Sequence, residues 1–142
     1  MQRAHLRLLA VAMAIWMGLS CPARAETLYE DLGGQSGLVR IIAEMGRRNA
    51  ADPRIRDQFD NVNTERLHRL LVTQICELTG GPCTYRNLDM MKAHAHLSIT
   101  MRDFNAMVEN LQAAMETCGI PFRTQNRLLA LLAPMHRDIV TR

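Results

Sequence analysis

Aromatic side chains are scarce in this 142-residue chain, which has one tryptophan, two tyrosines and three phenylalanines. The tryptophan, Trp16, lies close to the N-terminus, so the rest of the chain keeps only the tyrosines and phenylalanines. Aromatic residues normally supply much of the volume of a protein core. Leucine, isoleucine and methionine are plentiful here, but the shortage of aromatic volume also suits a core that a large flat cofactor completes.

Long apolar runs are absent except near the N-terminus. Arg3 and Arg7 give that end a positive charge, and the apolar stretch 8–19 that accompanies them is too short to span a bilayer comfortably. Ala23-Arg24-Ala25 then has the small-x-small form of a cleavage site. The sequence therefore predicts a secretory signal peptide over residues 1–25, cleaved after Ala25.

The expected signal peptide leaves one small domain over residues 26–142 and predicts export to the periplasm or the cell exterior. Cys21 raises the alternative of a lipoprotein, but Gly18 stands where a lipoprotein signal prefers a branched aliphatic residue. An uncleaved membrane anchor is the other alternative. Once the signal is removed, we expect no association with a membrane.

An excess of one charge sign is also missing from the expected mature domain. The whole chain has 17 lysines and arginines against 14 acidic residues, but Arg3, Arg7 and Arg24 belong to the predicted signal. The remaining domain is formally neutral, so nothing indicates nucleic acid or an anionic membrane surface as a partner. We expect a monomer or a weak dimer.

Closely spaced pairs of cysteine and histidine, which would indicate a zinc site, are absent. Cys76 and Cys83 flank the turn Thr79-Gly80-Gly81-Pro82, so their side chains can approach each other easily. In an oxidising compartment this arrangement predicts a Cys76–Cys83 disulfide, the alternative being two separate buried thiols. Cys118 is left over, near the end of an expected helix.

Alternating strand patterns, internal repeats and low-complexity segments are absent, and the apolar periodicity is helical throughout. We expect an all-α domain. After a short turn over 27–32, the expected helices cover 36–51, 64–78, a short segment around 90–99, 101–118 and 122–141. A further short turn has Pro53 at its first helical position, and Asn63 caps the 64–78 helix. A Thr100–Asp103 capping box begins the 101–118 helix, and Pro134 is expected to kink the last helix. The inner face of the 64–78 helix is expected to carry Leu67, Leu70, Leu71, Gln74, Ile75 and Leu78.

His94 is the candidate functional residue that the pattern itself selects. Met90, Met91, His94 and Leu97 recur at spacings of three and four, so they share one face of a helix. A histidine on such an apolar stripe must satisfy two ring nitrogens away from water. Coordination of a haem iron would satisfy one of them, while the soft Met and Leu side chains cover the porphyrin. A core histidine that is simply hydrogen-bonded is the alternative.

The order of these features closely resembles that of the group I truncated haemoglobins. The matching features are the glycine pairs Gly33-Gly34 and Gly80-Gly81, the Asp52-Pro53 segment followed by Phe59, the proximal-histidine motif from Met90 to Ile99, and the break Gly119-Ile120-Pro121. The resemblance implies a compact two-over-two helical fold that binds haem b, with His94 as the proximal ligand of the iron. The haem contacts that it implies are Phe59, Leu67, Leu71, Tyr85, Met90, Met91, Leu97, Ile99, Phe104 and Val108.

The distal side of the expected haem departs from the family pattern. The family usually has a tyrosine where this chain has Gly46, polar groups or leucine where it has Leu67 and Leu71, and often phenylalanine where it has Gln74. A donor in a dry pocket stabilises iron-bound dioxygen by roughly 1–3 kcal/mol, which is about one to two decades in release rate. We therefore expect weak dioxygen stabilisation and an enlarged cavity beside Gly46.

Two other side chains remain as candidate distal donors. Gln74 would serve if it bends toward the iron. His68 is either a residue that contacts the iron or its ligand, or a residue at the surface near the haem propionates, and the second interpretation is the more ordinary one. His96 lies two residues from His94, so on a helix it points elsewhere.

The resemblance implies a protein that binds dioxygen, nitric oxide or carbon monoxide reversibly rather than an enzyme with catalytic residues of its own. One alternative is a nitric oxide dioxygenase or peroxidase-like enzyme, which needs a stable oxygen complex and an external reductant. Another is an electron-transfer or haem-handling protein in which His68 is a sixth iron ligand. The missing distal donors argue against the first alternative.

Overall fold

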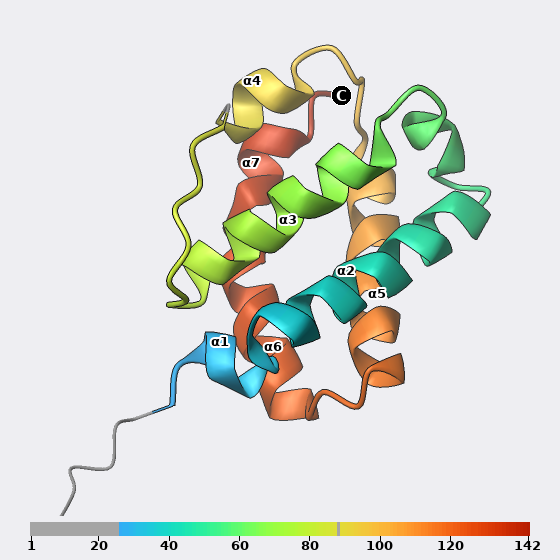
Figure 1. Ribbon diagram of the computed structural model, residues 1–142. Coiled ribbons are helices and arrows are strands. Elements are labelled where there is room, and N and C mark those ends of the chain that lie inside the picture. Colours follow the sequence, from blue (N-terminus) through green and yellow to red (C-terminus); the bar gives the residue numbers. More distant parts are fainter. Residues whose placement is uncertain (1–25, 88) are drawn as a thin grey trace, which may run out of the picture.

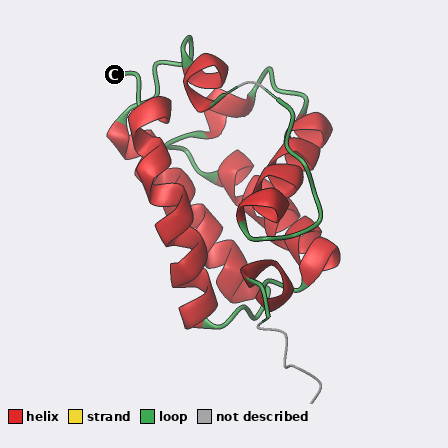
Figure 2. Cartoon of the chain, turned by 90° about the vertical axis from the view of Figure 1, so that its left-hand side faces the viewer, coloured by secondary structure: helices red, strands yellow, loops and turns green. Residues whose placement is uncertain are grey.

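A computed structural model of the chain describes residues 26–87 and 89–142. The expected signal peptide, residues 1–25, lies outside the described residues. Helices and loops make up the described part of the chain, and it contains no strand (Figure 2). The elements are α1 (Leu28–Asp31), α2 (Gly34–Ala51), the 3-10 turn η1 (Arg56–Phe59), α3 (Thr64–Leu78), α4 (Met90–His94), α5 (Met101–Thr117), α6 (Phe122–Leu132), the 3-10 turn η2 (Ala133–Met135) and α7 (His136–Ile139).

Two pairs of helices cross each other, as the all-α prediction requires. In Figure 1, α2 and α3 run side by side and cross α5 and the α6–α7 segment behind them, with contacts between α2 and both α3 and α5. α4 packs against α7 at the end of the molecule where the chain finishes. The apolar residues buried between the layers include Leu32, Leu38, Ile41, Ile42, Met45, Val72, Ile75, Cys76, Leu111, Met115 and Leu128.

The turn between α1 and α2 depends on two glycines. Gly33 and Gly34 have φ angles of 87° and 62°, in the left-handed region that other residues rarely adopt. The chain can therefore reverse between α1 and α2 within two residues. Because Gly34 already belongs to α2, the helix begins two residues earlier than the sequence pattern predicts.

Pro53 is the first residue of a hydrogen-bonded turn, as the sequence predicts, although this turn precedes the 3-10 helix and is not part of it. The Asp52 side chain accepts a hydrogen bond from the Arg54 backbone N–H at 3.0 Å, and the Asp52 carbonyl accepts from Ile55 and Arg56. These bonds form a turn around Pro53, and the 3-10 helix begins only at Arg56. The turn places Phe59 at the end of η1, next to the start of α3.

α3 and α5 have the bounds and caps that the sequence predicts, to within one residue. Asn63 accepts a hydrogen bond from the Arg66 backbone at the start of α3, and Thr100 and Asp103 form the reciprocal capping box at the start of α5. Leu78, at the last position of α3, was wrongly assigned to the inner face. It is exposed, because Cys76 and Thr79 fill the interior at that end of the helix.

The last expected helix is broken at Pro134. Proline has no backbone N–H to continue an α-helix, and the chain passes through the 3-10 turn η2 before α7. After α7 the chain is extended, and the backbone N–H groups of Thr141 and Arg142 donate to the Ile99 carbonyl at 2.9 and 3.2 Å. The C-terminal residues are thus fastened beside the segment that follows His94.

Across the described ranges, no helix combines the length and the apolar character that crossing a membrane would need.

Candidate functional site

His94 is the last residue of the short helix α4, which Asp89 caps by accepting a hydrogen bond from the Lys92 backbone at 2.8 Å. The Nδ1 atom of His94 lies 2.7 Å from the backbone carbonyl oxygen of Met90. A carbonyl can only accept, so Nδ1 carries the proton and the lone pair of the ring is on Nε2. No described residue forms a hydrogen bond with Nε2. The half-buried imidazole is therefore oriented and poised to bind a metal ion through Nε2.

The segment that follows His94 is held in place by the last two residues of the chain. Ile99 is buried, and its backbone N–H donates to Oγ1 of Thr141 at 3.0 Å while its carbonyl accepts from the last two residues. Phe104 on α5 meets His136 on α7 edge to face, with the ring centroids 6.2 Å apart. The loop after α4 is thus fastened to the C-terminal residues, and the ring contact joins α5 to α7.

Gln74 connects α3 with the His94 helix instead of entering the cavity described below. Its Nε2 atom lies 3.5 Å from the sulfur of Met90 and 3.8 Å from the sulfur of Met135. Thioether sulfur is a weak acceptor, so these contacts are mainly packing. The structure thus brings Gln74 and Met90 together, on the side of α3 that faces α4.

Most of the other predicted distal residues lie around one cavity between α2 and α3. Its volume is about 50 Å³. A water molecule needs roughly 10–15 Å³ measured in this way, so a diatomic molecule has room. The cavity is lined by Met45, Gly46, Asn49, Ala50, Phe59, Thr64, Leu67, His68 and Leu71.

His68 occupies the space beside Gly46. A Cβ atom added to Gly46 would lie 2.7 Å from Cε1 of His68 and closer still to Nε2. The imidazole of α3 therefore fills the volume that a side chain on Gly46 of α2 would take. Of the two interpretations of His68 that the sequence leaves open, the structure shows the ring half-buried and turned toward α2.

Several predicted haem contacts are spread around α4 and α5. α4 ends at His94, so Leu97 lies beyond the helix and does not share its face; this expectation was wrong because the helix is too short. Met91 and Leu97 are 61% and 42% exposed. Tyr85, Met90, Phe104 and Val108 are half-buried, and Ile99 is buried.

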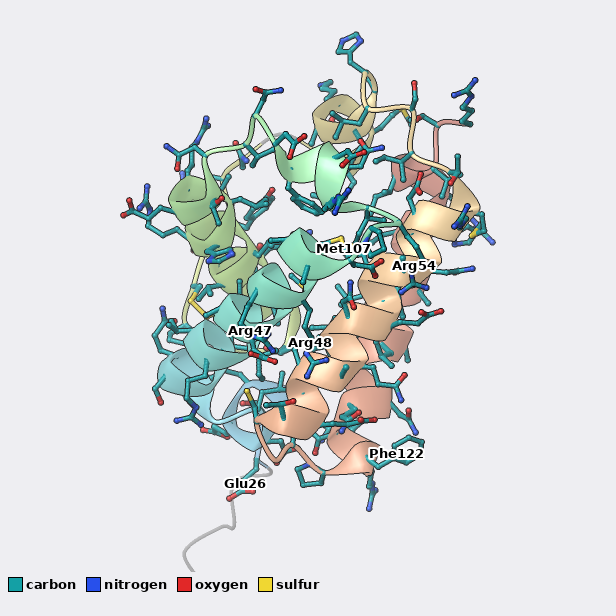
Figure 3. The ribbon with its side chains drawn as sticks, turned by 90° about the vertical axis from the view of Figure 1, so that its right-hand side faces the viewer. Glu26, Arg47, Arg48, Arg54, Met107 and Phe122 are labelled. Atoms are coloured by element: carbon teal, nitrogen blue, oxygen red, sulfur yellow. A yellow bond between two sulfur atoms is a disulfide. The ribbon has the colours of Figure 1, made fainter. Side chains whose placement is uncertain are left out.

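A polar network next to the cavity was not foreseen. Asn110 of α5 donates through Nδ2 to Oδ1 of Asn49 at 3.1 Å and to Asp52 at 3.0 Å. Arg54 in turn joins Asp52 to Glu109, with both N–O distances 2.7 Å (Figure 3 labels Arg54 beside α5). Asn49 is buried and lines the cavity. The sequence does contain a signal for the position of Asn49: it lies three residues after Gly46, and residues three apart share a helix face.

The hydrogen bonds and charges of this network lower the pKa of Asp52 and raise the pKa of Arg54. Hydrogen bonds from the Arg54 side chain and backbone, together with one from Asn110, hold the pKa of Asp52 far below its usual range. The hydrogen bonds that the Arg54 side chain donates to Asp52 and Glu109 raise the pKa of Arg54. The network therefore stays ionised at neutral pH and fixes the end of α2, beside the cavity, against α5.

The predicted disulfide is present in the structure. Cys76 is buried near the C-terminal end of α3. It is bonded to Cys83, in the connection that leads to α4, with 5.8 Å between their Cα atoms. Cys118 is a free, half-buried cysteine at the end of α5. The disulfide thus fixes the start of the connection between the helix that carries His68 and the helix that carries His94.

Comparison with known proteins places this geometry in a family. The bacterial-like globin family matches residues 27–141. Among curated relatives, a group 1 truncated hemoglobin of Mycolicibacterium paratuberculosis is 28% identical over 119 residues, covering 84% of this chain and 88% of the relative. A group 1 truncated hemoglobin of Tetrahymena thermophila is 30% identical over 94 residues, covering 66% and 78%.

Solved structures show the same fold. The truncated hemoglobin of Tetrahymena pyriformis in its Fe(III) form superposes with a TM-score of 0.79 at 24% identity, covering 82% of this chain and all of that one. The hemoglobin of Chloroflexus aurantiacus superposes with a TM-score of 0.70 at 26% identity, covering 81% and 98%. The chain therefore belongs to the bacterial-like globin family, as a group I truncated globin.

Proposed function

We propose that this globin binds haem b, which Nε2 of His94 would hold through its iron, and that the bound haem takes up a diatomic gas reversibly. Membership of the globin family implies haem binding. The observation that carries the assignment to His94 is its hydrogen bond from Nδ1 to the Met90 carbonyl, because this bond leaves Nε2 as the free ligand atom. Haem supplies an iron with one further coordination position for dioxygen, nitric oxide or carbon monoxide.

The donor set of the chain fits such a group. A neutral imidazole is a standard ligand of haem iron, and the hydrogen bond to the Met90 carbonyl fixes the tautomer and the orientation of the His94 ring. The apolar side chains of Phe59, Leu67 and Leu71 surround the cavity and exclude water from a ligand held there. The chain's own contribution would therefore be an oriented histidine to hold the iron and a largely apolar pocket for the ligand.

Three lining positions of the pocket are apolar where the matching separations along the chain of a structural neighbour carry polar residues. The solved structures of the Tetrahymena pyriformis protein include variants of one tyrosine and of two glutamines. Those residues have the same separations along the chain as Gly46, Leu67 and Leu71 here. Because these three positions are apolar in this chain, fewer donors face the ligand, which favours rapid release over the long-lived complex that turnover requires.

A titration with haemin tests this function. The optical spectrum of the purified protein is followed during haemin addition, then after reduction with dithionite, for the wild type, His94→Ala and His96→Ala. We expect saturable one-to-one uptake by the wild type and by His96→Ala, which changes an exposed histidine two residues away. Uptake by His94→Ala should be weak and should lack the same bands.

The same samples test gas binding. Carbon monoxide added to the reduced wild type should shift its spectrum, and the shift should reverse when the gas is removed. Uptake that is indifferent to His94→Ala would overturn the assignment of the ligand. A reduced spectrum that ignores carbon monoxide would overturn gas binding but leave haem binding standing.

The location of the protein is a separate part of the proposal. Residues 1–25 act as a secretory signal that is cleaved after Ala25, and the protein works in the periplasm or outside the cell. The Cys76–Cys83 disulfide supports this, since such bonds persist in oxidising compartments. Expression in a bacterial host should give a periplasmic protein, and its intact mass should be that of a chain beginning at Glu26. A cytoplasmic protein that retains residues 1–25 would contradict it.

A further inference from the structure

We propose that His68 is the polar residue of the ligand pocket, a hydrogen-bond donor carried by α3 in place of a side chain on α2. The inference rests on the proposed gas-binding function and names the residue that tunes it. The sequence leaves His68 undecided between the pocket and the surface. The contact between His68 and Gly46 decides the question.

Gly46 and His68 form a matched pair. The three atoms nearest to a Cβ built on Gly46 are Nε2, Cε1 and Cδ2 of His68, so this side chain fills the space next to the glycine. The edge of the His68 ring that faces Gly46 carries the Nε2 atom. Any larger residue at position 46 would displace the imidazole, and the glycine is therefore what admits the histidine.

His68 is also the cavity's polar side chain without a protein partner. Oδ1 of Asn49 is occupied by Asn110, and the Thr64 hydroxyl is directed to the Val62 carbonyl. Neither ring nitrogen of His68 forms a hydrogen bond with a described residue. A half-buried ring nitrogen without a partner is free to bond with whatever enters the cavity.

The neighbours of His68 define what it would recognise. Leu67 and Leu71 on the same helix and Phe59 at the end of η1 make the rest of the lining mainly apolar. In such surroundings a single donor has a large effect on a ligand that carries partial negative charge and a small effect on a neutral one. His68 should therefore favour dioxygen over carbon monoxide.

The first test measures the packing of the pair without any ligand. Thermal unfolding of the haem-free protein is compared for the wild type, Gly46→Ala, His68→Ala and the double variant. Alanine on its own should stabilise α2 relative to glycine. Because the Cβ collides with the ring, we expect Gly46→Ala to be less favourable in the wild type than in the His68→Ala background, by at least about 3 °C in Tm. Additive effects would overturn the pairing.

The second test measures the effect on the ligand in the haem-loaded protein. In His68→Ala, dioxygen should dissociate about ten- to a hundredfold faster, while carbon monoxide dissociation changes much less. The C–O stretching frequency of the carbon monoxide form should rise, because a donor lowers it. His68→Gln, which keeps a donor, should recover part of both effects, and His96→Ala should change neither.

The outcomes separate this inference from the function on which it rests. Unchanged dioxygen release and C–O stretching in His68→Ala would overturn it even if His94-dependent uptake of haemin stands. A six-coordinate reduced spectrum that disappears in His68→Ala would also overturn it, because the histidine would then be an iron ligand instead of a donor. Failure of His94-dependent uptake would remove the proposed function, and the thermal comparison would still report on the pair.

Discussion

The backbone of Leu32 lies directly against Gly37. A Cβ on Gly37 would approach the Leu32 carbonyl carbon to 2.9 Å and its oxygen more closely still. A backbone carbonyl cannot rotate away as a side chain can, so Gly37→Ala should force α1 and α2 apart. We expect a loss of about 1–3 kcal/mol in the free energy of unfolding, although alanine is the better helix former. Urea denaturation measures it, with Gln35→Ala on the exposed face as the control. Equal stability of Gly37→Ala would show that the two elements do not pack this closely.

Asp52 makes the stability of the protein depend on pH in a predictable direction. Since its pKa is lowered in the folded state, the ionised carboxylate stabilises the fold at neutral pH. That contribution is complete above the pKa of the unfolded chain, about 4, and is lost as the pH falls through the lower folded value. We expect Asp52→Asn to lower Tm by several degrees at pH 7, with the gap to the wild type closing below about pH 4. Glu109→Gln removes a much more exposed partner of Arg54 and should have little effect. A gap that stays constant in acid would contradict this account.

Reduction of the disulfide should destabilise the protein. The bond between Cys76 and Cys83 closes a loop with a sequence separation of 7, for which the chain-entropy relation gives about 2–3 kcal/mol. Urea denaturation with and without a reductant measures the loss, and Cys118→Ser is the control because Cys118 is free. Insensitivity to the reductant would mean that the bond is absent from the protein in solution.

Thr141 should matter for the segment that follows His94. Thr141→Val removes the hydroxyl that accepts from the buried Ile99 N–H and leaves that donor without a partner. We expect a cost of about 1–3 kcal/mol, seen as faster hydrogen exchange of the Ile99 amide and faster loss of haem. Thr84→Val, a change of the same shape at an exposed position, is the control. Unaltered exchange at Ile99 would show that the two backbone bonds from the C-terminus are sufficient.

The predictions that the structure confirms depend on local signals. Asn63 and the Thr100–Asp103 box mark the starts of α3 and α5, because a cap involves residues only three apart in the sequence. The bond of His94 to Met90 is equally local, being one helical turn long. The fold class and the starts of these helices could therefore be predicted from the sequence, whereas His94 as the ligand of an iron stays a prediction.

The remaining features depend on contacts between elements. The direction of His68 depends on the absence of a side chain at Gly46, which belongs to another helix. Helical periodicity places His68 beside Leu67 but does not reveal what faces it, so its role became visible only with α2 in position.

The disulfide also affects how accurately the chain oxidises. The three cysteines of the described residues, Cys76, Cys83 and Cys118, offer three possible pairs. The native pair is by far the closest in sequence, since Cys118 is about five times farther from Cys83 than Cys76 is. The entropy of closing a loop grows with its length, and this difference favours the native pair about tenfold before any tertiary structure forms. Under oxidising conditions the chain should thus acquire its native bond early, with little need for an isomerase to correct pairings with Cys118.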